Sequence, residues 1–132
     1  MRFTEHELTV AVTSAAKTVA NVRQRGVRRR AGGGAEETWA AMSPYERYQV
    51  LEPVGSQVLP ALVALPDVEV APGTRPSFTD AQVLAAIEET LGEAGGRLRR
   101  KVVVAARLAL VRAALAQLPP RQDPDALTTD SA

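Results

Sequence analysis

Two clusters of basic residues are the side chains of this sequence best suited to binding an anion. The first cluster precedes a run of glycines and consists of Arg28, Arg29 and Arg30, with Arg23 and Arg25 just before them. The second cluster follows Gly95 and Gly96 and consists of Arg97, Arg99, Arg100 and Lys101. Guanidinium groups bind carboxylates and phosphates through paired hydrogen bonds. These residues are therefore the candidate anion- or partner-binding residues of the chain.

The second cluster lies where helix electrostatics oppose it. A helix is predicted to begin near Arg97, and cations at a helix N-terminus are unfavourable by about 0.3–1 kcal/mol each. A glycine-rich turn leading into a helix can bind phosphate, although the spacing here is not that of a Walker motif. Three interpretations stay open: pairing with Glu88, Glu89 and Glu93 across the turn, binding of an anion or nucleic acid, and a helix that begins elsewhere.

The first cluster has a simpler interpretation. It is predicted to lie at the C-terminal end of the first helix, where the helix dipole favours cations. A solvated helix end is therefore the expected role of Arg28, Arg29 and Arg30. A patch that binds phosphates or acids is the alternative.

No combination of residues in this sequence indicates catalysis. Cysteine is absent and His6 is the only histidine, so neither a thiolate nucleophile nor a multi-histidine metal site can form within one chain. The adjacent carboxylates at 36–37 and 88–89 do not share a helix face, which argues against an acid–base pair. We therefore expect a protein that is not an enzyme and has no cofactor or metal.

Three phrases in the sequence predict where helices begin. Thr4 and Thr79 each follow a phenylalanine and precede Glu7 or Gln82 by three residues, which is the pattern of a capping box. Ser43 has Glu46 in the same relation and is followed by proline, a common first helical residue. These phrases indicate positions of helix starts and carry no chemistry.

Apolar spacing then predicts an all-α fold, a compact bundle of about five helices. The expected helical segments are 5–24, 35–42, 44–51, 54–65, 80–91 and 97–118. Pro53 is expected to end the third of these, because proline disrupts a helix interior. Residues 1–118 are predicted to form one domain, and residues 119–132 a disordered polar tail.

The segment 97–118 has the most unusual composition of these helices. From Val102 onward it is apolar almost all round, which is typical of a helix at the centre of a bundle or in a dimer interface. Charge is also segregated, because residues 51–96 carry −6 and residues 97–112 carry +6. Adjacent blocks of opposite charge favour internal pairing or self-association over general binding of polyanions.

The leading hypothesis is a small, cytoplasmic, non-catalytic interaction or regulatory protein that forms a homo-oligomer, such as a homodimer, or binds a protein partner. A cytoplasmic location is expected because Glu5, His6 and Glu7 stand where a leader peptide would be apolar, and no stretch would cross a membrane. Nucleic-acid binding through the arginine clusters 23–30 and 97–101 is possible but not favoured. An enzyme acting on an acidic or phosphorylated small molecule is the third alternative.

Overall fold

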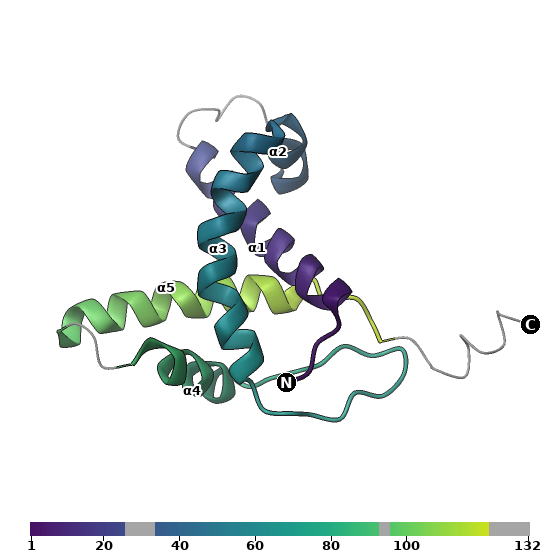
Figure 1. Cartoon of the computed structure of the whole chain (residues 1–132), viewed down its shortest axis with the longest axis vertical. Coiled ribbons are helices and arrows are strands. Elements are labelled where there is room, and N and C mark those ends of the chain that lie inside the picture. Colours follow the sequence, from purple (N-terminus) through teal and green to yellow (C-terminus); the bar gives the residue numbers. More distant parts are fainter. Residues whose placement is uncertain (26–33, 93–95, 122–132) are drawn as a thin grey trace, which may run out of the picture.

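The structure is a computed structural model that describes residues 1–25, 34–92 and 96–121, with the side chains of residues 24 and 25 excepted. These residues form helices and no strand, which confirms the predicted all-α fold. The helices, drawn in Figure 1, are α1 (Glu5–Arg25), α2 (Ala35–Ala41), α3 (Pro44–Ala64), α4 (Asp80–Leu91) and α5 (Arg97–Ala116). Of the predicted tail, residues 122–132 lie outside the described part of the chain.

The helices are arranged around α1 and α3, which pack against each other and across α5. The short helix α2 packs against α1, and α4 packs against both α3 and α5. In Figure 1, α2 lies at one end of α3 and the α4–α5 pair lies at the other. The largest fully buried side chains belong to α3, α4, α5 and the segment after α5: Leu62, Ile87, Leu118, Val58, Val83 and Val111.

The three predicted capping boxes are all present. The Thr4 N–H donates to Glu7 Oε1 at 2.9 Å, and the Glu7 N–H donates back to Thr4 Oγ1 at 3.1 Å. The same reciprocal pair joins Thr79 with Gln82 and Ser43 with Glu46. Each box satisfies backbone donors that a helix start would otherwise leave without a partner, and so fixes where α1, α3 and α4 begin.

The predicted break at Pro53 is wrong, because α3 runs without interruption through Pro53 and Pro60. Each proline removes one intrahelical donor, which leaves the carbonyls of Gln49 and Ser56 without their usual bond. Both of these residues are exposed, so water can reach that side of the helix. The opposite side buries a continuous row: Val50, Val54, Val58, Ala61 and Leu62. Tertiary packing along this row therefore outweighs the local preference to stop.

The segment that follows α5 is tied to the rest of the chain as far as Arg121. The backbone of Arg121 donates to the Thr74 carbonyl at 2.8 Å and accepts from the Gly73 N–H at 2.7 Å. Its guanidinium donates to both carboxylate oxygens of Glu7, at 3.2 and 3.3 Å, and to the Arg2 carbonyl at 2.9 Å. One side chain thus joins the end of the described chain to its beginning.

Candidate interaction site on α5

Helix α5 is buried along only part of its length. Its buried residues are Val111, Ala114 and Leu115, all in the C-terminal half that crosses α1 and α3. The N-terminal half projects to one side beside α4, as Figure 1 shows. Leu98 and Val102 in this half are 82% and 67% exposed. A central position for the whole helix, one of the two environments expected from its composition, does not occur in the single chain.

The outward face of α5 is apolar from Leu98 to Ala109. A set of exposed residues recurs on it at alternating intervals of four and three residues, with Arg112 interrupting the pattern once. These residues are Leu98, Val102, Ala105, Ala109 and Ala116. At about 100° per residue they point away from the buried Val111 and Leu115. A surface helix ordinarily carries its charges on this side, so α5 presents to solvent the kind of face that helices bury.

The arginines of α5 lie on its flanks and its inner side instead. Arg112 reaches sideways to α4, where its Nε donates to Asp80 Oδ1 at 2.7 Å and its Nη1 to the Phe78 carbonyl at 2.9 Å. Arg107 lies one turn before Val111 on the inner side, and its buried Nε has no hydrogen-bond partner among the described residues. The helix therefore has a partly buried arginine on its inner side, whereas its outward face is uncharged from Leu98 to Ala109.

The members of the second arginine cluster have different surroundings. Arg100 donates to the carbonyl of Gly92, the residue that ends α4 with a φ of 66°. A cation at the C-terminus of α4 is favourable, which offsets its unfavourable position near the start of α5. Arg97, Arg99 and Lys101 are exposed, and no ion pair joins them to another described residue.

The basic cluster therefore forms no ion pair with the described residues of the acidic stretch. Glu88 and Glu89 are both exposed and neither forms an ion pair within 4.0 Å with the cluster. Glu93 lies outside the described residues. The cluster consequently presents three cations that are available to another molecule.

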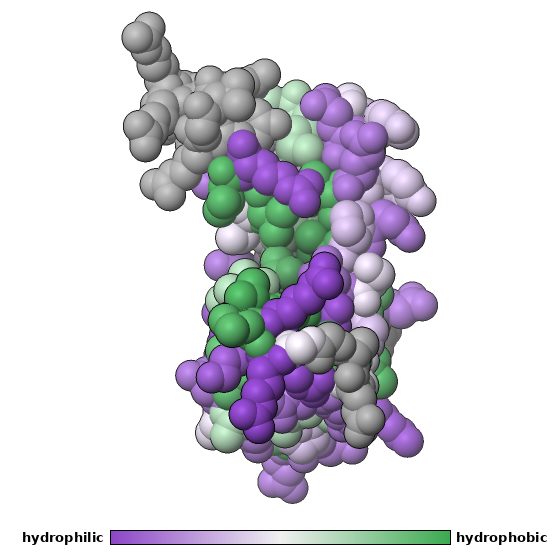
Figure 2. All heavy atoms as spheres, turned by 90° about the vertical axis from the view of Figure 1, so that its left-hand side faces the viewer, coloured by the Kyte–Doolittle hydropathy of each residue, from purple (hydrophilic) through white to green (hydrophobic). Residues whose placement is uncertain are grey.

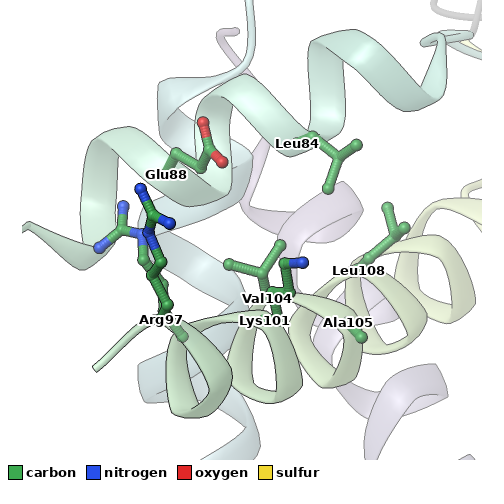
Figure 3. A pocket seen from close by; sticks show the side chains of 8 residues that line it. Leu84, Glu88, Arg97, Lys101, Val104, Ala105 and Leu108 are labelled. Carbon is green, nitrogen blue, oxygen red and sulfur yellow. The ribbon is translucent and has the colours of Figure 1, made fainter. Parts of the chain in front are cut away.

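A shallow groove separates α4 from the N-terminal half of α5. It has a volume of about 470 Å³, and its floor is apolar: Leu84, Val104, Ala105 and Leu108. Arg97, Arg100 and Lys101 line its rim together with Glu88, which stands on α4 across from Arg97 in Figure 3. Ala105 belongs both to the groove and to the outward face of α5. The groove and the outward face therefore form one continuous surface.

Figure 2 looks onto the side of the molecule from which α5 projects. Hydrophobic and strongly hydrophilic side chains lie next to one another there, with the hydrophobic ones gathered rather than scattered. Gathered apolar surface on a single chain is typical of a site that another molecule covers. Because Leu98 and Val102 are exposed and the groove lies beside them, the projecting half of α5 is the candidate functional site.

Of the first arginine cluster, Arg23 is the one member whose side chain the structure describes. Arg28, Arg29 and Arg30 lie in the segment 26–33, which is outside the described residues. Arg23, which precedes them, is exposed in the last turns of α1. In Figure 1 this end of α1 lies near α2, away from the projecting end of α5. The described residues thus do not bring the two clusters together.

Comparisons with protein-family models, with curated proteins and with solved structures find no match to this chain. No helix in the described part of the chain has a stretch that is both long and apolar enough to cross a bilayer. Nor do the described residues contain a group of three or more histidines and carboxylates that could hold a metal ion. The geometry of α5 is therefore the basis on which a function is proposed.

Proposed function

We propose that this protein is a non-catalytic helical interaction protein that associates with itself through the outward face of α5. The observation that carries the proposal is that this face is exposed and uncharged from Leu98 to Ala109. In a monomer, the side of a helix that faces solvent ordinarily carries its charged residues. A second molecule covering the face accounts for the opposite arrangement.

The apolar residues involved are large enough to drive association. Burying a leucine or valine side chain that was exposed is favourable by about 1.5–3 kcal/mol. Leu98 and Val102 are the two most exposed large apolar side chains of α5. A contact between two helix faces is at the small end of specific interfaces, so we expect association in the micromolar range or weaker.

The experiment compares two variants by light scattering after size-exclusion chromatography. The Leu98→Gln/Val102→Gln double variant should elute as a monomer at concentrations where the unchanged protein is associated. Val63 on α3 is 64% exposed, close to Val102, so Val63→Gln is the matched control and should associate normally. Because all three positions are exposed, we expect the free energy of unfolding of each variant to differ from that of the unchanged protein by no more than about 0.5 kcal/mol. Unaltered association of the double variant would contradict the proposal.

Nucleic-acid binding is the second candidate, and the three cations without ion pairs among the described residues favour it. Arg97, Arg99 and Lys101 are exposed on one end of α5, where phosphates could approach them. If they bind nucleic acid, an electrophoretic shift should appear at low salt and weaken steeply as salt is raised. The triple alanine variant at these positions should abolish the shift. No shift at low salt would remove this candidate.

A further inference from the structure

We infer that the partner on α5 is a second copy of the same helix, packed antiparallel around a two-fold axis. In this arrangement Leu98 of each copy lies against Ala109 of the other, and Val102 lies against Ala105. The inference rests on the proposed self-association and adds its orientation and register. It follows from the order of side-chain sizes, from the distribution of charge and from the position of Arg112.

Side-chain size changes along the outward face in one direction. Leu98 and Val102 occupy the N-terminal half, whereas the positions that continue the pattern are alanines: Ala105, Ala109 and Ala116. An antiparallel pair sets each large side chain against an alanine, so the two faces fill each other evenly. A parallel pair would set Leu98 against Leu98 and leave Ala109 against Ala109, which combines crowding with an unfilled gap.

Charge favours the same orientation. A parallel pair would bring Arg97, Arg99 and Lys101 of one copy directly beside the same residues of the other. In the antiparallel pair, at 1.5 Å per residue, the axial separation is about 20 Å between the two Arg97 residues, about 14 Å between the two Arg99 residues and about 8 Å between the two Lys101 residues. The separations between the arginines exceed the screening length of about 8 Å at physiological salt, and the separation between the lysines is about equal to it. Repulsion between the clusters is therefore weaker than in the parallel pair, where the same residues lie side by side.

The antiparallel pair also provides an acid for each basic cluster. Helix α4 lies on one flank of α5, since Asp80 at its start binds Arg112 and Leu84 faces Leu108 across the groove. A two-fold axis perpendicular to the helix pair keeps both copies of α4 on the same flank. The Arg97 end of one copy then lies beside the Asp80 end of the other. The Asp80 side chain is largely exposed and its hydrogen bonds to Arg112 use only Oδ1.

The register is set by the one charged residue near the face. Sliding the two copies by one heptad would place Val102 against Arg112, whose guanidinium is engaged with Asp80. The register proposed here keeps Arg112 beyond the paired segment. Intervals of four and three residues suit helices that cross at about 20°, and alanines allow their axes to approach within about 8 Å.

Cysteine cross-linking tests the orientation directly, because the chain contains no cysteine of its own. Two single variants, Leu98→Cys and Ala109→Cys, are prepared separately and then mixed under a mild oxidant. The mixture should yield a disulfide-linked dimer that contains one chain of each variant. Leu98→Cys alone should yield little disulfide dimer, because its two thiols would be about 16 Å apart and disulfides need Cα atoms within about 7 Å.

Sedimentation of the same variants under reducing conditions separates the two proposals. If Leu98→Cys alone cross-links efficiently, the pair is parallel and this inference is wrong. If the variants sediment as dimers but the mixture does not cross-link, the inference is wrong while self-association stands. If the unchanged protein and both variants sediment as monomers, self-association itself fails and the inference fails with it.

Discussion

The rings of Phe3 and Phe78 lie with their centroids 6.4 Å apart and their planes inclined by 59°. Each phenylalanine directly precedes a capping threonine, so the starts of α1 and α4 meet through their aromatic residues. This inclined geometry is favourable for aromatic pairs. The two similar phrases of the sequence are thus neighbours in space: Phe78 is part of the core, and Phe3 packs against that core.

Replacement of Phe78 should therefore destabilise the fold strongly. Phe78 is only 6% exposed, and a buried phenylalanine truncated to alanine costs about 3–5 kcal/mol. We expect Phe78→Ala to lower the free energy of unfolding in urea by about 3 kcal/mol. Phe3 is half-buried, so Phe3→Ala should cost less. Equal losses for the two variants would contradict this account of the contact.

Arg121 should contribute to stability although it lies in a segment whose composition predicts disorder. It is the side-chain partner of Glu7, whose residue is 3% exposed, and a hydrogen bond to a charged group is worth about 1.5–3 kcal/mol. Arg121→Leu should lower the free energy of unfolding by about that amount. Arg121→Lys keeps the charge but loses the paired geometry, so its loss should be smaller. No effect from Arg121→Leu would show that the ion pair contributes nothing in solution.

Replacement of Arg107, in contrast to replacement of Arg121, should not destabilise the fold. Its Nε is buried without a partner among the described residues, so an apolar side chain of similar length removes a desolvation cost. We expect Arg107→Met to leave the unfolding free energy unchanged or to raise it by about 1 kcal/mol. Arg112→Met, which breaks the bonds to Asp80 and Phe78, is the contrasting variant and should destabilise. A comparable loss for both variants would indicate that Arg107 has a structural partner.

The sequence predicted well those features that depend on a few adjacent residues. The capping boxes at Thr4, Ser43 and Thr79 are such features, because each is completed within four residues. The all-α class followed from apolar spacing over longer segments. The failure at Pro53 came from applying a local rule to a helix that distant residues hold in place.

The candidate interaction surface could be predicted only in part. The sequence indicated that the last helix was unusual. The spacing of Leu98, Val102 and Ala105 by four and three residues is also visible in the sequence. A helix that is apolar almost all round gives no indication of which side faces the core. Contacts with α1 and α3 decide this, and those contacts are between residues far apart in the sequence. The contacts of Arg100 with Gly92 and of Arg121 with Glu7 could not be predicted either, because they too depend on the tertiary fold.

Sedimentation equilibrium of the unchanged protein tests the central claim most directly. As concentration is raised through the micromolar range, we expect the average mass to climb from the 14.1 kDa of one chain toward twice that value. The Leu98→Gln/Val102→Gln variant should stay at the mass of one chain over the same range. A constant 14.1 kDa for the unchanged protein at every concentration would contradict self-association through α5.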